Sequence, residues 1–361
     1  MILNPKEYTP SLRWRQGEYQ ALFFMSEELK DLICPLVTIP PVEFDFELQI
    51  PKKSPHEHIH PFAKRLNAKW GQRACWIDLH PTLREALMDD GRVTYDYIFQ
   101  ELRDYEANAV PVVSLDMATQ TRAIICTIVE TDQKGVGLRL RLIDLMDPAT
   151  PAAVDAIIAE MGLTAAETDL LIDIEAPNYD PLNVFEMALM AQVNGLGDLR
   201  RFRNYSLIGT GFPESMAGIP KGNSTIPRQH WILYKQIVDA LPDDARVPCF
   251  GDYTVTHPDF VALNMRLVKP SGKIIYTIQD AWHVEKGGSF RDDQQQMHTH
   301  SQNIQSNGVY RGAGYSFGDH FIEQCATHAT GPSNLSRWKC VCVNHHMTTV
   351  LEDLATYHAG L

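Results

Sequence analysis

Eight short apolar runs recur along the chain, and amphipathic segments separate most of them. The runs are rich in β-branched residues or bounded by turn-forming residues, which favours strands over helices. None exceeds eight residues, a usual length for a buried strand. We expect eight strands at residues 33–39, 74–79, 109–116, 137–143, 169–176, 205–211, 247–253 and 273–278.

Helical patterns fill most of the intervals between these runs. The segment TPAAVDAIIAEMG has the usual punctuation of a helix, with Thr150 as N-cap, Pro151 at the first helical position and Gly162 past the end. Strands that alternate with helices predict a parallel sheet, because each crossover needs a connection of helix length. The predicted helices span residues 61–69, 93–107, 117–131, 150–161, 182–194 and 227–240.

The number of strands favours one of two parallel architectures. An open doubly wound sheet also fits the alternation, but eight βα units in about 250 residues is the size of a (β/α)8 barrel, an α/β fold. We therefore predict a single TIM-like barrel domain over residues 1–361. Residues 1–30 form an N-terminal segment in this scheme, 31–280 hold the barrel strands, and 281–361 hold a long loop and a C-terminal helical block.

Composition narrows the classes of partner. The 361 residues are 44% hydrophobic, enough for a large core, and carry a formal net charge of −13. This charge gives no overall basic surface for nucleic acid or an anionic membrane. The sequence shows neither a signal-peptide pattern nor an apolar stretch of 18 residues, so we expect a cytoplasmic protein. The oligomeric state stays open.

Seven cysteines are scattered mostly through the apolar runs, and none forms a CxxC pair. We expect all seven to be free thiols in a reducing compartment. Cys340 and Cys342 alternate in the run WKCVCV, which we expect to be extended. The separation of alternate residues on a strand does not favour a disulfide between them.

The active face of a (β/α)8 barrel lies at the C-terminal ends of its strands, so polar residues there are candidates for chemistry. Asp173 and Glu175 in LLIDIEAP would share one face of a strand. If that face is the interior, burial and mutual repulsion should raise both pKa values, as suits a general acid. Alternatively, one of them caps a helix or pairs with Arg139 or Arg141. Other polar residues near strand ends are Glu43, Asp78, His80, Asp116, Asp144, Thr210, Glu214, Asp252, Tyr253, Gln279, Asp280 and Lys286.

Histidines gather in three groups: HEHIH at 56–60, MHTH at 297–300, and the pair at 345–346. Alternate histidines on an extended segment share a face and can bind zinc. HEHIH begins 17 positions beyond Ile39, however, so it does not sit at the end of the first predicted strand. A solvated loop is the simpler interpretation. The sequence contains no nucleotide-binding, zinc-protease or serine-hydrolase motif, and metal and cofactor requirements stay open.

Five segments together point to a known family. They read YTPSLRWRQGEYQAL (8–22), GFPESMAGIPKGNSTIPRQHWILY (211–234), FGDYTVTHP (250–258), IYTIQDAWHVEKGG (275–288) and YSFGDHFIEQCATHATGPSNLSRWKCVCVNHHMTTVLEDLA (315–355). Over almost its whole length the chain resembles the beta protein family of bacteriophages and bacterial genomes. The resemblance implies a phage, mobile-element or anti-phage defence setting, and it implies no particular reaction.

The resemblance also implies that a set of residues forms a shared feature: Glu18, Arg228, Gly318, Asp319, Trp338, Asn344, His345 and His346. In WKCVCVNHH we expect a short extended run whose Asn344 caps a helix over 345–357.

Two functions fit these observations. The first is a hydrolase or lyase that acts on a phosphate-containing or nucleotide-like ligand at the barrel mouth. Its expected catalytic residues are Asp173, Glu175, His345 and His346. Its expected ligand-binding residues are Glu18, Thr210, Arg228, Asp252, Lys286, Asp319, Trp338 and Asn344, of which Arg228 or Lys286 would hold the anion. The second is a non-catalytic barrel that recognises a partner protein or a phage component.

Overall fold

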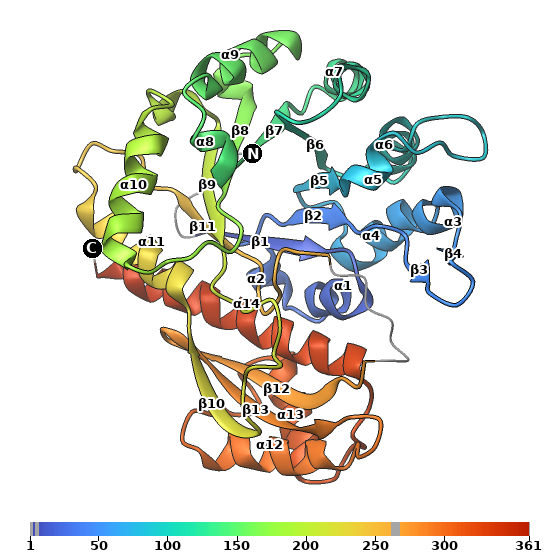
Figure 1. The fold of residues 1–361 in the computed structure, drawn as a ribbon, viewed down its shortest axis with the longest axis vertical. Coiled ribbons are helices and arrows are strands. Elements are labelled where there is room, and N and C mark those ends of the chain that lie inside the picture. Colours follow the sequence, from blue (N-terminus) through green and yellow to red (C-terminus); the bar gives the residue numbers. More distant parts are fainter. Residues whose placement is uncertain (1–2, 4–6, 261–267, 361) are drawn as a thin grey trace.

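A computed structural model describes residues 3, 7–260 and 268–360. The barrel strands in this part of the chain are β1 Tyr8–Arg13, β2 Leu36–Ile39, β5 Cys75–Leu79, β6 Ala109–Ser114, β7 Val136–Arg141, β8 Thr168–Asp173, β9 Asn204–Gly209 and β11 Cys249–Asp252. They are parallel and close in the order β1-β11-β9-β8-β7-β6-β5-β2 (Figure 1). The predicted (β/α)8 fold is confirmed.

One barrel strand was assigned wrongly from the sequence. The eighth strand is β1, near the N-terminus, which pairs in parallel with both β11 and β2 and so closes the cylinder. Residues 273–278 lie in β12, Ser271–Ile278, outside the barrel. The sequence of β1, YTPSLR, combines Pro10 with a polar residue at every second position, which argues against a buried central strand, whereas residues 273–278 have the apolar, β-branched composition of one.

Helices surround the barrel, and each of the six predicted helices starts within two residues of its expected position. HEHIH lies in a short helix, not in a loop. The helices of this part are α1 Gln16–Phe23, α2 Glu27–Lys30, α3 Pro55–Ile59, α4 Phe62–Trp70, α5 Pro81–Arg84, α6 Thr94–Asp104, α7 Thr119–Asp132, α8 Leu142–Leu145, α9 Thr150–Glu160, α10 Leu182–Asn194 and α11 Gln229–Ala240. Short elements complete it: the hairpin β3 Phe44–Asp45 and β4 Ile50–Pro51, and the 3-10 turns η1 Ala165–Glu167 and η2 Leu199–Arg201.

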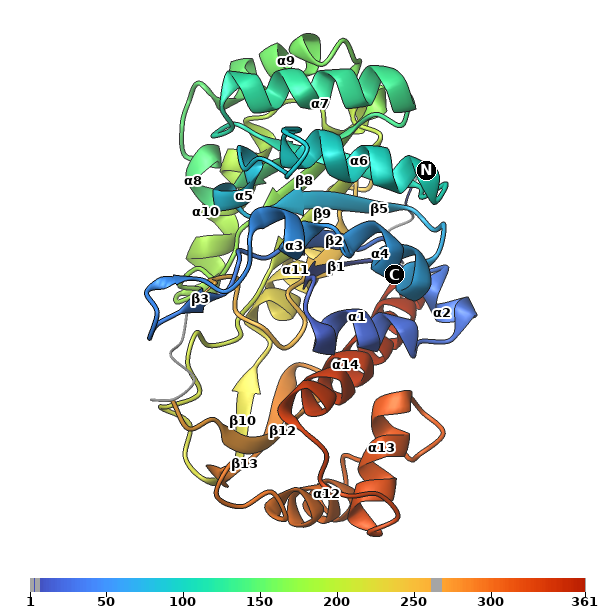
Figure 2. The same ribbon diagram turned by 90° about the vertical axis from the view of Figure 1, so that its right-hand side faces the viewer.

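A smaller antiparallel sheet stands beside the barrel, with β10 (Gly222–Pro227), β13 (Ala281–Ser289) and β12 in that order (Figure 2). Helix α12 (Gln296–Ser306) packs on this sheet, and α13 (Phe317–Ala326) packs on α12. Residues 281–312, expected to be a long loop, therefore hold a strand and a helix. The missed signal is the two-residue connection 279–280 between two apolar runs, which is typical of a hairpin.

One long helix, α14 (Leu335–Ala359), lies between the barrel and the small sheet in both views (Figures 1 and 2). It contacts α1, α13, β12 and β1. The expected extended run before Asn344 is wrong, because Asn344 lies inside this helix and Asn334 is the N-cap. Residues 340–351 are all buried, so the segment lacks the alternation of apolar and polar faces that marks a surface helix.

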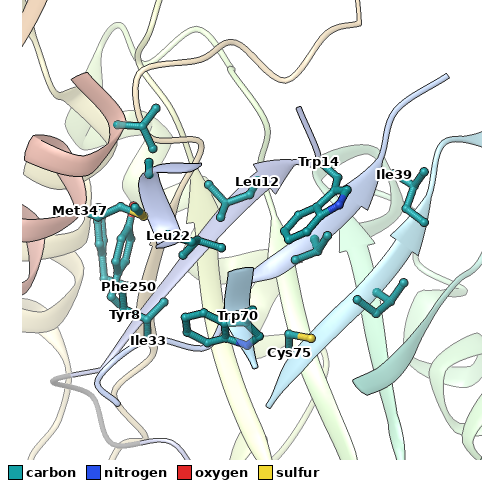
Figure 3. Packing of buried hydrophobic residues seen from close by; sticks show 14 of the residues in the cluster. Tyr8, Leu12, Trp14, Leu22, Ile33, Ile39, Trp70, Cys75, Phe250 and Met347 are labelled. Atoms are coloured by element: carbon teal, nitrogen blue, oxygen red, sulfur yellow. The ribbon is translucent and has the colours of Figure 1, made fainter. Parts of the chain in front are cut away.

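Two buried clusters fill the fold. The larger one lies between strands and helices; Figure 3 shows its part around β1, where Leu12, Leu22 and Trp70 pack together. The smaller one fills the barrel from alternate strand positions, among them Leu36, Trp76, Val112, Leu171 and Ile208. The Trp76 ring packs against Gly137, where a side chain would not fit, since a Cβ at this position would lie 2.9 Å from the indole ring.

All seven cysteines are free, as predicted. Cys340 and Cys342 lie on a helix, not on the extended run that was expected. None of the helices in residues 7–260 and 268–360 has the length and hydrophobicity needed to cross a bilayer.

Candidate active site at the barrel mouth

A polar layer lies above the apolar filling of the barrel, at the C-terminal ends of the strands. Its members stand two residues after inward-facing positions and therefore also face inward: Thr38, Asp78, Ser114, Arg139 and Asp173. All of them except Asp173 line the floor of a cavity of about 210 Å³, the mouth cavity. The titratable side chains that line it are Asp78, His80, Arg84, Asp116, Arg139, Arg141, Glu175 and Asp259.

Arg139 ties two buried carboxylates together on the floor. Its guanidinium donates to Asp78 Oδ2 at 2.7 Å and to Asp173 Oδ2 at 2.9 Å. The Tyr253 phenol donates to the same Asp173 oxygen at 2.5 Å. Although burial disfavours the charge, Asp173, Tyr253 and Asp78 hold the pKa of Arg139 well above its ordinary value. Asp173 therefore has the ion pair with Arg139 that was the structural alternative to a catalytic role.

Two further arginines stand on the rim of the cavity. Arg84 Nη1 donates to Asp116 Oδ1 at 3.1 Å, and Arg141 Nη2 lies 3.3 Å from Asp116 Oδ2. Burial opposes the ionisation of Asp116, but a hydrogen bond from Ser114 and the two arginines lower its pKa. The rim thus holds two guanidinium groups around one ionised carboxylate, with N–H donors close to any oxygen that enters the cavity.

Glu175 is a carboxylate of the mouth cavity that takes no part in these ion pairs. Its side chain is half-buried on the cavity wall and has no hydrogen bond or ion pair among the described residues. Burial raises the pKa of Glu175, and the charge of Asp173 raises it further. Its backbone is left-handed, with φ 55°, and its carbonyl accepts from Thr210 N at 2.8 Å. Such strained backbone in a non-glycine residue is concentrated at functional sites.

The sequence prediction for this pair was correct only in part. Glu175 lines a cavity and has a raised pKa, as expected. The two carboxylates do not share a strand face, because β8 ends at Asp173 and the left-handed turn redirects Glu175. Sequence reasoning missed Arg84, which enters from the short helix α5 and not from a strand. The role of Arg139 in the floor could have been predicted from its position on β7, two residues after Gly137, because residues two apart on a strand share a face.

His80 adds a neutral imidazole to the wall. Its Nδ1 accepts from Thr82 N at 3.4 Å at the start of α5, so the ring proton lies on Nε2. Burial lowers the pKa of His80, and the neighbouring Arg84 lowers it further. His80 can therefore donate one hydrogen bond near neutral pH without carrying charge.

The histidines of the Asn-His-His segment lie elsewhere, in a network between the barrel and α14. Asp252, at the end of β11, accepts from Nε2 of His346 at 2.8 Å and of His230 at 3.3 Å. Gly211 N and Trp282 Nε1 donate to the Nδ1 atoms of His230 and His346, at 3.1 Å and 3.4 Å. Each imidazole is therefore neutral, with its proton on Nε2 and aimed at Asp252.

The shifts in pKa agree with this assignment. Burial lowers the pKa of His230 to about 4 and lowers that of His346 as well. Burial works against ionisation of Asp252, but His346 and His230 hold its pKa well below the ordinary value.

His345 has a different partner, Asp319 of α13. Its Nδ1 lies 2.8 Å from Asp319 Oδ2, and its Nε2 lies 2.9 Å from the carbonyl oxygen of Thr277. Asp319 also accepts from the hydroxyls of Tyr276, at 2.6 Å, and Ser316, at 2.5 Å. Both ring nitrogens of buried His345 therefore lie within hydrogen-bond distance of an oxygen acceptor, one a carboxylate and one a carbonyl. We call Asp252, His230, His346, Asp319 and His345 the polar lock.

The other expected site residues also lie outside the mouth cavity. Asn344 donates to the carbonyl of Ala21 and accepts from Gly318 N, both at 3.1 Å, so it fastens α14 to α1 and α13. Arg228 is fully buried and bonds Asp353 at 2.6 Å.

Three of the expected ligand-binding residues lie nearer a second cavity. Lys286 donates to the carbonyl of Met216 at 2.7 Å. Glu18 is buried and accepts from Thr256 at 3.3 Å, and burial raises its pKa. Trp338 lines this second cavity directly.

The three histidine groups do not form a metal site in the described residues, where no cluster of three or more His, Cys, Asp or Glu side chains could hold an ion. In α3, His56 stacks on His60 at 5.3 Å between ring centroids, and His58 bonds the carbonyl of Pro40. His298 stacks on His328.

The fold and this site define a (β/α)8 barrel with a charged cavity on its active face and an appended sheet-and-helix block. The Beta protein family model matches residues 8–352, nearly the whole chain. The chain therefore belongs to the Beta protein family, as the resemblance indicated. A search of curated proteins finds no match.

Proposed function

We propose that the protein is an enzyme, a hydrolase or lyase, that performs proton-transfer chemistry in the mouth cavity on a phosphate-containing or nucleotide-like ligand. The setting that we propose, in a phage, a mobile element or an anti-phage defence system, comes from the family resemblance. Fold alone does not select a reaction, since this barrel hosts many. The proposal therefore rests on the side chains at the mouth.

The observation that supports this proposal best is the environment of Glu175. A carboxylate that is half-buried, has no partner among the described residues and has a raised pKa is suited to give a proton to a leaving group or to take one from a ligand. The neighbouring Asp173 keeps its charge satisfied by Arg139. The two carboxylates thus have separate tasks, one in chemistry and one in supporting the floor.

The remaining groups on the wall suit orientation of a ligand. Arg84 and Arg141 offer N–H donors to ligand oxygens, and His80 offers a neutral donor beside them. We propose no catalytic part for His345 and His346, since their ring nitrogens are engaged in the polar lock, away from the mouth cavity.

The test is a survey of phosphate monoesters, phosphodiesters and nucleotides, with product release followed by chromatography. Glu175→Gln should lower kcat/KM at least about a hundredfold, the usual contribution of a general acid or base. Glu160→Gln is the matched control, because Glu160 pairs with Arg122 on outer helices. Activity that depends on protonated Glu175 should fall as pH rises through its raised pKa.

Full turnover by Glu175→Gln would contradict this assignment. If no compound of the survey is turned over by the wild-type protein, the non-catalytic barrel that recognises a partner becomes the better description.

A further inference from the structure

A second cavity lies where the barrel meets the C-terminal block, and we call it the junction cavity. Its volume is about 370 Å³, against about 210 Å³ for the mouth cavity. The end of β1, the loops after β9 and β11, strand β12 and helix α14 all contribute to its wall. Asp259 lines both cavities, so the two are neighbours.

The two cavities differ in the sign of their charge. The junction cavity has four cationic side chains on its wall, Arg13, Arg15, Lys273 and Lys339, against the two carboxylates of Glu214 and Asp259. The mouth cavity has three arginines against four carboxylates. An anionic group is therefore attracted to the junction cavity more strongly than to the mouth cavity.

The two lysines lack carboxylate partners at ion-pair distance in the described residues. Lys339 Nζ donates to the carbonyl of Val255 at 2.7 Å and to the hydroxyl of Thr256. The side chain of Lys273 has no hydrogen bond or ion pair among these residues. Burial lowers the pKa of both lysines, that of Lys339 to about 8. The carboxyl of Glu18 favours the charged form of Lys339, whereas Lys273 has no carboxylate at ion-pair distance among the described residues. A partly desolvated ammonium group is costly, and a bound anion would relieve that cost.

Apart from Thr256 and His257, the rest of the wall is apolar. Phe212, Val255, Ile275 and Trp338 line it, and all four are buried residues. A cavity of this size, mostly apolar with a few charged groups, is typical of a small-molecule site. It suits a phosphate group attached to an apolar or aromatic body better than inorganic phosphate alone.

We propose that the junction cavity is a subsite for the phosphate group of a ligand whose other end reaches the mouth cavity. Lys273, Lys339 and Arg15 supply the donors and the charge. A phosphomonoester carries about −1.5 to −2 near neutral pH, which matches the excess of cations on this wall. Only the fate of the ligand's other end rests on the function proposed above.

Calorimetric titration with phenylphosphonate tests the subsite, because this probe combines an aromatic body with a phosphate-like anion that has no P–O ester to hydrolyse. The wild-type protein should bind it, and Lys273→Gln should weaken binding about tenfold or more, the usual loss for a charge-assisted hydrogen bond. Arg15→Gln, at an exposed residue, should also weaken binding and does not depend on the tolerance of a buried position. Lys269→Gln is the matched control, because Lys269 is exposed and pairs with Asp292 at 3.1 Å.

The outcomes separate this inference from the proposed function. If Glu175→Gln loses catalysis but still binds phenylphosphonate, both stand. If binding depends on Lys273 while no compound is turned over, the subsite stands and the enzyme assignment fails. No binding by the wild-type protein, affinities of Lys273→Gln and Arg15→Gln that both equal the wild-type affinity, or binding lost only in Arg141→Gln at the mouth would each overturn the subsite.

Discussion

The mouth cavity and the polar lock are both clusters of carboxylates with basic side chains, yet their hydrogen bonding differs. In the lock, each ring nitrogen of His230, His345 and His346 has a partner within 3.4 Å. At the mouth, Glu175 has none among the described residues, and the cavity gives solvent and ligands access to it. The polar groups of the lock bond to other groups of the protein, whereas at the mouth Glu175 is open to a ligand.

This difference changes the meaning of the most distinctive segment of the sequence. Asn344, His345 and His346 look like a catalytic group, but their contacts connect α14 to α1, α13, β12 and the end of β11. Buried polar networks of this kind fix one arrangement of the packed elements only when every member is satisfied. We infer that the lock sets how the C-terminal block sits against the barrel, and hence the shape of the junction cavity.

The largest expected effect is the loss of Asp319. Asp319→Ala leaves the buried groups of His345 and Tyr276 without their carboxylate partner, and each such loss typically costs about 1–3 kcal/mol in the free energy of unfolding. Urea denaturation followed by circular dichroism measures the change. The control Asp292→Ala removes an exposed partner of Lys269 and should leave stability almost unchanged. Equal, small effects of the two substitutions would show that the buried hydrogen bonds of Asp319 contribute little to stability.

The next effect is a dependence of stability on pH. His230 has a pKa of about 4 in the folded protein and an ordinary value of 6.5, so the unfolded chain binds more protons between these values. The stability that neutral His230 contributes is complete above about pH 6.5 and is lost as pH falls toward 4. Each such proton adds a slope of up to about 1.4 kcal/mol per pH unit.

Urea midpoints measured from pH 7 to 4.5 on wild type and on His230→Gln check this dependence. The glutamine amide can still donate to Asp252, but it does not titrate, so the variant should show the shallower slope. Parallel slopes would mean that His230 is not the neutral group that its contacts indicate.

A smaller effect should come from the support beneath the mouth. Gly137→Ala adds a methyl group 2.9 Å from the Trp76 ring, and overpacking of this kind costs about 1–3 kcal/mol. Because Arg139 stands two residues further along β7, the displaced strand should also weaken ligand binding at the mouth. Gly71→Ala separates a loss of stability from a loss of ligand binding. It strains a residue with φ 77°, but its new methyl group has no neighbour within 4 Å. Normal binding in Gly137→Ala would show that the floor does not depend on this packing.

The sequence contained enough to predict the barrel because seven of its strands in the described residues fall in runs that are mostly apolar. It did not reveal β1, where polar residues stand at every second position beside Pro10, or the identity of residues 273–278, whose composition is equally good for a hairpin. Glu175 was predicted from its position after a strand. Its orientation away from Asp173 was not predicted, because alternate residues share a face only while the strand continues, and the left-handed turn at Glu175 ends the strand.

The smallest expected effect on stability distinguishes the two carboxylates of the mouth. Burial and Asp173 raise the pKa of Glu175, so any stability that this group contributes is present below its unfolded pKa and is lost as pH rises through the folded value. At neutral pH, Glu175→Gln should therefore leave the melting temperature unchanged or slightly higher. Asp173→Asn removes the charge that pairs with buried Arg139 and should lower the melting temperature by several degrees. If Glu175→Gln lowers it as much as Asp173→Asn does, Glu175 is a structural group, and the mouth is a second lock instead of a site for a ligand.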